Sequence, residues 1–269
     1  MTYHRWPSPS VKRCIHSTIG ACGFELCESR GPLGYFLRRK DRFGVDHLHD
    51  IRTIVGRPLR CILDIGAHVG ETAITFADAF SGAAIYSFEP DPENFATARR
   101  NVSNIPRIKI FNAAVGRQDT TESLHRTEGS QTHSLLPVAD QAERYVVSPQ
   151  NLKSVADVTV EVKSLDKFAQ DFNIEPPDLL KADTQGYELE VLSGATAMLC
   201  GAHPPLLYLE VAFVHQYRNQ PLFQDVYTWV YDRGYRLVGL YGRGYSTHYY
   251  QVGTDALFVH ETMGARERR

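Results

Sequence analysis

Two stretches of the chain carry residues whose spacing suits chemistry at the edge of a β-sheet. In the first, an apolar run ends at Asp64, and Gly66 and Gly70 interrupt the residues that follow. This pattern predicts a buried parallel strand, a tight turn and the start of a helix. Open α/β sheets bind ligands at such turns. Glycines allow close backbone approach and the helix N-terminus offers free N–H groups, so we expect this turn to bind a cofactor.

The spacing within the turn distinguishes between cofactors. A dinucleotide-binding turn reads G-x-G-x-x-G, and here His68 stands where the second glycine would be. The pattern Asp-x-Gly-x-x-x-Gly instead resembles motif I of the S-adenosylmethionine methyltransferases. In that motif the loop passes under the methionine part of the cofactor and cradles no pyrophosphate.

Glu89 ends the next predicted strand, about twenty residues beyond Gly70. A carboxylate at this place can accept hydrogen bonds from both ribose hydroxyls of a nucleoside, although it also fits a helix N-terminal acid. Small residues after the third strand leave room for an adenine ring, although simple close packing explains them equally well. The predicted cofactor-binding residues are Asp64, Gly66, Ala67, His68, Gly70, Glu71, Thr72, Glu89, Pro90, Asn112, Ala113, Ala114 and Asp183.

The second stretch runs from Lys181 to Glu188 and places a lysine and an acid at the end of another strand. Asp183 would lie near both the reactive end of the cofactor and the substrate. It could accept a proton, hold the cofactor or a metal, or simply cap a helix. Glu210 ends the neighbouring strand, so we predict Asp183 and Glu210 as the catalytic pair, either a base with its partner or two oxygen ligands.

Candidate substrate contacts are less specific. His133 and Ser134 lie in a long polar segment from residue 117 to 158, and Gln185 and His215 follow strand ends. Segments of this length in compact domains are usually functional or disordered. A structural or solvent-exposed position explains each histidine better than a catalytic role does.

These residues need a parallel sheet to bring them together. From Leu59 onward, strand-like and helix-like segments alternate, which predicts an α/β fold with helices on both faces. We divide the chain into a partly helical N-terminal extension (1–58), a catalytic domain (59–262) and a polar tail (263–269). Helical spacing over 45–55 predicts a helix just before the first strand. Strands are predicted over 61–65, 83–88, 107–112, 178–183, 205–211, 235–240 and 255–259, with a short hairpin at 121–126 and an edge strand at 158–162.

Composition excludes several classes of protein. The chain has 269 residues, of which 43% are hydrophobic and 22% charged, with a formal net charge of −2. Nothing in this balance indicates a nucleic-acid partner or a membrane span. Five cysteines without a C-x-x-C pair predict free thiols rather than disulfides or a zinc site. The N-terminus lacks the apolar core of a secretory signal, so we expect a cytoplasmic protein.

The ordered set of motifs resembles the FkbM-type family of S-adenosylmethionine-dependent methyltransferases over roughly 45–259. The motifs are Ile62 to Thr72, Phe88-Glu89-Pro90, Asn112 to Gly116, Leu180 to Glu188, Leu209-Glu210-Val211 and Asp255 to Val259. The resemblance implies a Rossmann-like, class I sheet of seven strands whose last strand is antiparallel. One departure is Gln185, where many relatives carry a second carboxylate.

The resemblance also implies a reaction, which is transfer of a methyl group from S-adenosylmethionine to a hydroxyl of a sugar, glycolipid or polyketide-type natural product. A divalent metal and a homodimer stay open. Two other functions also remain open, a nicotinamide-dependent oxidoreductase and a methyltransferase-like subunit without catalysis. The His68 position argues against the first, and the intact Glu89 and Asp183 argue against the second.

Overall fold

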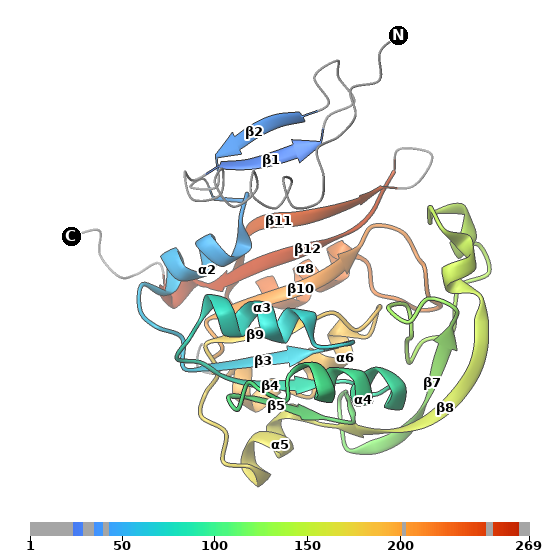
Figure 1. The fold of residues 1–269 in the computed structure, drawn as a ribbon, viewed down its shortest axis with the longest axis horizontal. Helices are drawn as coiled ribbons and strands as arrows, with labels where there is room; N and C mark the ends of the chain where they lie inside the picture. The colour runs from blue at the N-terminus through green and yellow to red at the C-terminus, as the bar shows by residue number, and fades with distance from the viewer. Residues whose placement is uncertain (1–23, 29–34, 40–42, 201–202, 246–249, 264–269) are drawn as a thin grey trace.

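The computed structural model describes residues 24–28, 35–39, 43–200, 203–245 and 250–263. Most of the predicted N-terminal extension before residue 43 and nearly all of the polar tail lie outside these ranges. The centre of the molecule is a seven-stranded sheet (Figure 1) in the order β11-β12-β10-β9-β3-β4-β5. Its strands are β3 (Cys61–Ile65), β4 (Ala84–Phe88), β5 (Ile108–Phe111), β9 (Leu179–Ala182), β10 (Leu206–Ala212), β11 (Tyr235–Tyr245) and β12 (Gln251–His260).

The sheet has the predicted direction of strands. β3, β4, β5, β9 and β10 pair in parallel, and β12 is antiparallel to both β10 and β11. This confirms the seven-stranded sheet with an antiparallel last strand. Because the parallel strands end at one edge, the residues that follow β3, β4, β9 and β10 meet there.

Successive residues of β3 explain why helices cover both faces. Ile62 points to one face, where it packs with α2 (His47–Val55), α3 (Glu71–Ala79) and the end of α4 (Pro92–Asn101). Leu63 points to the other face, against α5 (Leu165–Asp171), α6 (Glu188–Ser193), α7 (Thr196–Leu199) and α8 (Phe223–Tyr231). Both residues are buried. A strand buried on both faces reads as a continuous apolar run, which is what the sequence showed.

Local signals fix the two helices nearest the site. Asp91 caps α4 by accepting hydrogen bonds from the backbone N–H groups of Glu93 at 3.0 Å and Asn94 at 2.9 Å. Pro92 follows at the first helical position, where a missing N–H costs nothing. α3 starts after Gly70, whose φ of 88° favours glycine.

The segment 117–158 differs from the prediction. Strand β7 (Thr120–Thr127) pairs antiparallel with β8 (Ser154–Lys163), and β6 (Ala114–Val115) pairs with β8 in a second, three-stranded sheet. The prediction of a short hairpin within 121–126 was therefore wrong. This segment is a single strand, and its partner β8 begins about thirty residues further along the chain. Two short 3-10 helices, η1 (Ala142–Arg144) and η2 (Pro149–Leu152), lie between the strands.

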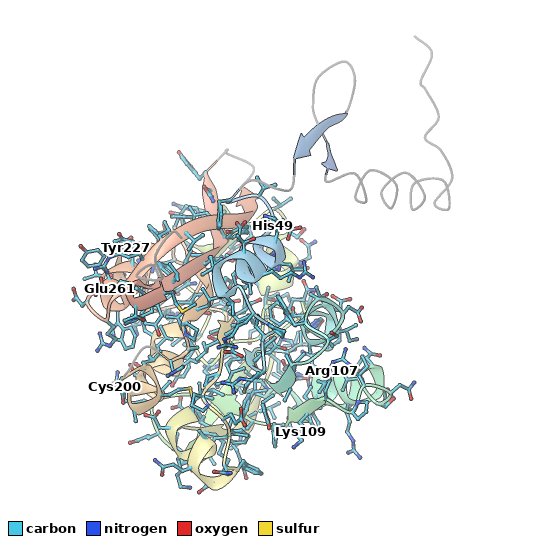
Figure 2. All side chains as sticks on the ribbon, turned by 90° about the vertical axis from the view of Figure 1, so that its left-hand side faces the viewer. His49, Arg107, Lys109, Cys200, Tyr227 and Glu261 are labelled. Carbon is cyan, nitrogen blue, oxygen red and sulfur yellow. The ribbon has the colours of Figure 1, made fainter. Side chains whose placement is uncertain are left out.

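The remaining elements complete the description. β1 (Phe24–Glu28) and β2 (Tyr35–Arg39) form an antiparallel pair that the sequence analysis did not predict, and η3 (Glu261–Met263) follows β12. Cys61 is buried in β3, Cys200 (labelled in Figure 2) is exposed, and both are free thiols. Across the described ranges, no helix has the length and apolar character needed to cross a membrane.

Candidate functional site

A cavity of about 420 Å³ opens at the edge where β3, β4, β9 and β10 end. Its volume lies within the usual range for small-molecule and cofactor sites, roughly 300–1,000 Å³. Of the residues predicted from the sequence, those lining it are Gly66, His68, Glu89, Pro90, Ala113, Ala114, His133, Ser134, Asp183, Gln185 and Glu210. Residues from six separate segments of the chain thus converge on one space.

A buried ion pair lies beneath the cavity floor. Asp64 and Lys181 are opposite each other on β3 and β9, with Lys181 Nζ 3.2 Å from Asp64 Oδ1. Lys181 also donates to the backbone carbonyls of Ile65 at 3.2 Å and Gly66 at 2.7 Å. Burial alone would lower the pKa of Lys181, but the carboxylates of Asp64 and Asp183 outweigh it and raise this pKa. Asp64 therefore supports the glycine turn from below and does not line the cavity.

Glu89 lies at the end of β4 and is 5% exposed. Its carboxylate accepts hydrogen bonds from the backbone N–H of His68 at 2.8 Å and of Asp91 at 3.0 Å. Burial raises the pKa of Glu89 to about 7, and these two N–H donors act in the opposite direction. The carboxyl group is thus held in place by the glycine turn on one side and by the start of α4 on the other.

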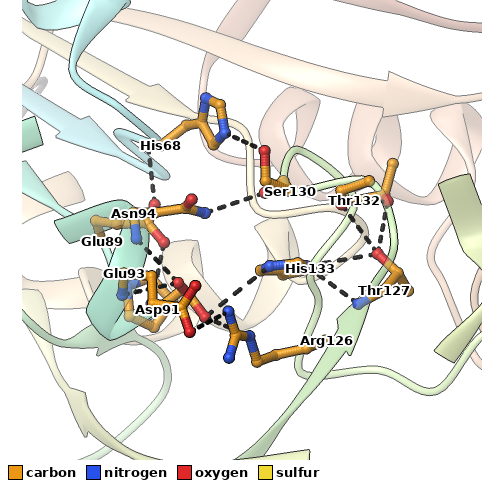
Figure 3. Close-up of polar contacts among 12 residues, drawn as sticks. His68, Glu89, Asp91, Glu93, Asn94, Arg126, Thr127, Ser130, Thr132 and His133 are labelled. Atoms are coloured by element: carbon orange, nitrogen blue, oxygen red, sulfur yellow. Dashed lines mark hydrogen bonds and ion pairs between the residues drawn. The ribbon is translucent and has the colours of Figure 1, made fainter. Parts of the chain in front are cut away.

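The loop 128–134 closes over this end of the cavity, as Figure 3 shows. Ser130 Oγ hydrogen-bonds His68 Nε2 at 2.9 Å, and its carbonyl accepts from Asn94 Nδ2 at 3.0 Å. Arg126 Nε, just before the loop, lies 2.9 Å from the buried carboxylate of Asp91. These contacts tie the loop to both β3 and α4.

His133 lies inside this arrangement. Its Nδ1 accepts a hydrogen bond from the Thr127 N–H at 3.2 Å, and its Nε2 lies 3.9 Å from Asp91 Oδ2 (Figure 3). Burial lowers the pKa of His133 and also that of His68. Both imidazoles are therefore biased toward the neutral form, which suits hydrogen bonding rather than charge pairing.

At the other end, Gln185 joins the two predicted catalytic carboxylates. Its Nε2 donates to Asp183 Oδ1 at 2.9 Å and to Glu210 Oε2 at 2.8 Å. Its Oε1 accepts from the hydroxyl of Tyr217 at 3.0 Å, and that hydroxyl also lies 3.0 Å from the Thr132 carbonyl. Gln185 has a φ of 56°, a left-handed conformation that is uncommon outside glycine.

The two carboxyl groups of this pair differ in environment. Burial, followed by the charge of Asp183, raises the pKa of Glu210 well above its usual value. The side chain of Asp183 is 39% exposed, and Lys181 Nζ is 3.8 Å away. Of the two, Glu210 is the group whose protonated form burial favours, and Asp183 is the more exposed carboxyl group.

The turn after β9 is held from within. Glu188 Oε1 accepts from the backbone N–H and the hydroxyl of Thr184 at 2.8 and 3.0 Å, and from the Gly186 N–H at 3.2 Å. Burial raises the pKa of Glu188 to about 7. This internal cap positions Gln185, because the turn it stabilises contains that residue.

The backbone that follows β3 touches the backbone that follows β9 at Gly66. This residue has a φ of 80°, and a Cβ placed on it would lie 1.8 Å from the carbonyl oxygen of Asp183. We expected Gly66 to make room for a ligand. In the structure its missing side chain makes room first for the strand that carries Asp183.

Several predicted site residues lie away from the cavity lining. Asn112 donates through Nδ2 to the carbonyls of Glu89 and Pro90, both at 3.0 Å, and so supports the loop rather than the cavity. His215 is exposed on the loop after β10. The predicted residues outside the lining are Asp64, Ala67, Gly70, Glu71, Thr72, Asn112 and His215.

Sequence reasoning also missed several residues that shape the site. Asn94, Ser130 and Tyr217 were not among its candidates, although each makes a hydrogen bond to a cavity element. Asn94 follows the cap of α4 by three residues, a spacing that places it on the face of the first turn and could have indicated it. Tyr217 carried no such signal, because its partners are about thirty and eighty residues away. Within the described part of the chain, no three His, Cys, Asp or Glu side chains are grouped so as to hold a metal ion.

The sheet order, the antiparallel last strand and the cavity at the carboxyl ends define a class I methyltransferase fold. The sequence profile of the methyltransferase FkbM domain matches residues 64–237. The chain therefore belongs to the FkbM methyltransferase family, as the motifs predicted, and the methyl donor of this family is S-adenosylmethionine.

Three similar proteins share about a quarter of their aligned residues with this chain. The 2-O-methyltransferase NoeI of Sinorhizobium fredii is 26% identical over 63% of this chain and 70% of its own. Methyltransferase 1 of Beauveria bassiana is 28% identical over 49% of this chain, and the chain spans 57% of its length. The hexuronic acid methyltransferase AglP of Haloferax volcanii is 24% identical over 51% of this chain, which spans 50% of its length.

Solved structures are also similar. The magnesium protoporphyrin IX methyltransferase ChlM of Synechocystis, determined with bound S-adenosylmethionine, superposes with a TM-score of 0.45 at 12% identity. The alignment covers 96% of this chain and 87% of that one.

Proposed function

We propose that the protein is an O-methyltransferase that moves the methyl group of S-adenosylmethionine to a hydroxyl of a sugar, glycolipid or polyketide-type natural product. The observation that carries this proposal is the Asp183 carboxylate. It faces the cavity, Gln185 fixes its direction at 2.9 Å, and Glu210 lies on the far side of the same amide. A positioned carboxylate at the end of a cofactor cavity is suited to take a proton from a hydroxyl.

The volume and the lining of the cavity support this choice of cofactor. Glu89 presents a carboxylate to the cavity where the two ribose hydroxyls would donate to it. Ala113 and Ala114 are small and buried, and together with Val115 they line the side of the cavity where the adenine would lie. Gly66 and His68 line the stretch between this side and Asp183, the place we assign to the methionine part.

The proposed mechanism uses the side chains already in place. When bound, the cofactor supplies an activated methyl group on a sulfonium, so no further activation of that carbon is needed. Asp183 would accept the proton that the acceptor hydroxyl loses when it is methylated. Gln185 holds Asp183 in one orientation, which removes a rotation from the reaction's entropy cost. Glu210 keeps its proton and so leaves Asp183 as the acceptor.

The relatives support a sugar as the acceptor. One is described as a 2-O-methyltransferase and another as a hexuronic acid methyltransferase. Family membership speaks against the nicotinamide-dependent oxidoreductase. The second candidate function is a non-catalytic subunit, which would bind the cofactor without turning over any acceptor.

The test combines binding with turnover. Calorimetric titration with S-adenosylhomocysteine should show binding, and radiolabelled S-adenosylmethionine should methylate members of a panel of hydroxylated glycosides. Asp183→Asn keeps the shape of the side chain but removes its basicity. It should lower turnover by about 10²–10⁴-fold, the usual contribution of a general base.

In that variant the affinity for S-adenosylhomocysteine should stay within a few-fold of the wild type. Binding of the nucleoside without turnover on any glycoside would favour the non-catalytic subunit. Normal turnover by Asp183→Asn would remove this residue from the mechanism.

A further inference from the structure

A second cavity of about 400 Å³ lies beside the first, at the same edge of the sheet. It is formed by the ends of β10, β11 and β12 and by the chain around η1. Glu210 lines both cavities, so the second one lies next to the catalytic end of the first.

One wall of the second cavity is polar. Glu210 and Asp255 are direct neighbours across the antiparallel pair β10–β12, and both carboxyl groups face this space. The Tyr208 hydroxyl donates to Asp255 Oδ2 at 3.0 Å and fixes its direction. Gln216 adds an amide at the rim. These groups offer several hydrogen-bond acceptors set close together.

The other wall is apolar. Tyr145 and Val147 come from the segment that contains η1, and Val252 comes from the start of β12. A sugar ring has hydroxyls around its edge and C–H groups on its faces. The two walls together therefore match a pyranose better than an extended apolar chain, which would donate no hydrogen bond to the remaining oxygens of the two carboxyl groups.

The charge in this cavity has one sign. Asp255 lines it, and Asp183 lies beyond Glu210, across the Gln185 amide, whereas burial keeps Glu210 itself protonated and uncharged. Among the described residues that form its lining there is no Lys, Arg or His. The nearest buried ammonium, that of Lys181, is already shared by Asp64, Asp183 and two backbone carbonyls.

We propose that the second cavity binds the acceptor of the methyl group, and that it takes a neutral or cationic sugar and rejects one that carries a carboxylate. This inference rests on the proposed function and names its substrate class. Hydroxyl and ammonium groups donate hydrogen bonds to Asp255 and Glu210. A carboxylate on the sugar meets the like charge of Asp255, and the described lining residues offer no cation to offset it; such a juxtaposition suppresses wrong partners.

The experiment measures binding of matched sugars to the protein saturated with S-adenosylhomocysteine. The probes are the methyl glycosides of glucose, galactose and mannose, together with the uronic acid and the 2-amino sugar of each. Ligand-observed NMR gives the dissociation constants. In at least one series the neutral and amino sugars should bind, with the uronate at least about tenfold weaker because of like-charge repulsion.

Asp255→Asn is the decisive variant, because it removes one charge and keeps the size of the side chain. It should strengthen uronate binding and narrow the gap to about threefold or less, since one of the repelling charges is gone. Asp171→Asn, an exposed aspartate at the end of α5, is the matched control and should leave the gap unchanged. Binding of S-adenosylhomocysteine should be the same in all three proteins.

Three results would overturn the inference: uronates that bind as well as neutral sugars, an Asp255→Asn variant with unchanged discrimination, or no sugar binding in any series. If these occur while S-adenosylhomocysteine binds and a methyl group is transferred to another acceptor, the methyltransferase proposal stands and only the acceptor class falls. Failure of the wild type to bind S-adenosylhomocysteine would instead bring down the proposed function itself.

Discussion

The two ends of the main cavity are built in different ways. At the Glu89 end, a carboxylate is held by backbone N–H groups of residues within about twenty positions of it in the chain. At the Asp183 end, the carboxylates are held by the side-chain amide of Gln185, and that amide is held by a tyrosine hydroxyl from a distant loop. Main-chain N–H groups position one end, and a series of hydrogen-bonded side chains positions the other.

The difference indicates a division of labour. Backbone donors move only when the fold moves, so the Glu89 end offers a fixed site for one constant ligand. Side-chain networks depend on every member, because loss of one leaves its partners unpaired. The Asp183 end should therefore be more sensitive to substitution in turnover than the Glu89 end is in binding.

The largest effect that this comparison predicts is that of Gln185→Glu. The change replaces a donor to two carboxyl groups by a third carboxyl group between them. Loss of hydrogen bonds worth about 1.5–3 kcal/mol each should lower turnover by about a hundredfold. Single-turnover kinetics at saturating cofactor would measure this.

Gln185→Met serves as the control for charge, because it removes the donors without adding a carboxyl group. If the repulsion matters, the loss in Gln185→Glu should shrink at lower pH, whereas the loss in Gln185→Met should not. Equal turnover in Gln185→Glu and the wild type would show that the network does not position Asp183.

Glu89→Gln should have the next largest effect, on binding rather than on chemistry. The amide keeps one acceptor oxygen but loses the charge that strengthens hydrogen bonds from the ribose hydroxyls. Affinity for S-adenosylhomocysteine should fall about tenfold, which corresponds to 1.4 kcal/mol. Asp78→Asn on α3, an exposed acid outside the cavity, should bind normally. Unchanged affinity in Glu89→Gln would place the ribose elsewhere.

The pH dependence of the same binding gives a smaller and more specific effect. The pKa of Glu89 is raised to about 7 in the free protein, and its ionised form is the better acceptor for hydroxyls. Affinity for S-adenosylhomocysteine should therefore rise by up to about tenfold from pH 6 to pH 8 as the carboxyl group ionises. Glu89→Gln should remove this rise, and its persistence in the variant would assign the titration to another group.

Ionisation of Glu89 has the opposite effect on the stability of the free protein. The folded state binds more protons at Glu89 than the unfolded state does between the ordinary pKa of 4.5 and about 7. The contribution of this group to the free energy of unfolding of the free protein therefore falls as the pH rises through that window.

Ser130→Ala should show the smallest effect. It removes the exposed hydrogen bond between the loop 128–134 and His68 but leaves the bond from Asn94 to the Ser130 carbonyl. A single hydrogen bond of this kind is worth about 0.5–1.5 kcal/mol, so affinity for the nucleoside should fall about threefold. Ser103→Ala, beyond the end of α4, is the matched control. Identical affinities would mean that the loop closes without this contact.

The sequence predicted what short-range signals determine. Apolar runs predicted all seven strands of the central sheet. Capping residues and glycines predicted the two helices nearest the site, α3 and α4, and the end of β4 placed Glu89. These features depend on neighbours within about twenty residues. The family and the class of fold followed from the order of the same motifs.

The rest depends on contacts between distant segments. The pairing of β7 with β8 was missed because about thirty residues without a strand pattern separate them. Tyr217 was missed because its partners, Thr132 and Gln185, belong to two other segments. Asp64 was assigned to the cofactor because nothing local reveals that Lys181, more than a hundred residues away, lies opposite it. The second cavity could not be predicted either, since only the folded sheet brings Asp255 beside Glu210.

The contact of Gly66 with the carbonyl of Asp183 has a consequence for engineering. Any larger residue at position 66 would displace the backbone at Asp183. A substitution at position 66 therefore also changes the position of Asp183. The three atoms nearest to a Cβ placed on Gly66 all belong to Asp183, and none comes from the described segments around the second cavity. A library that aims to change the acceptor can therefore vary residues 145–147 and 252–255, but should transplant the two joined strand ends together or leave both untouched.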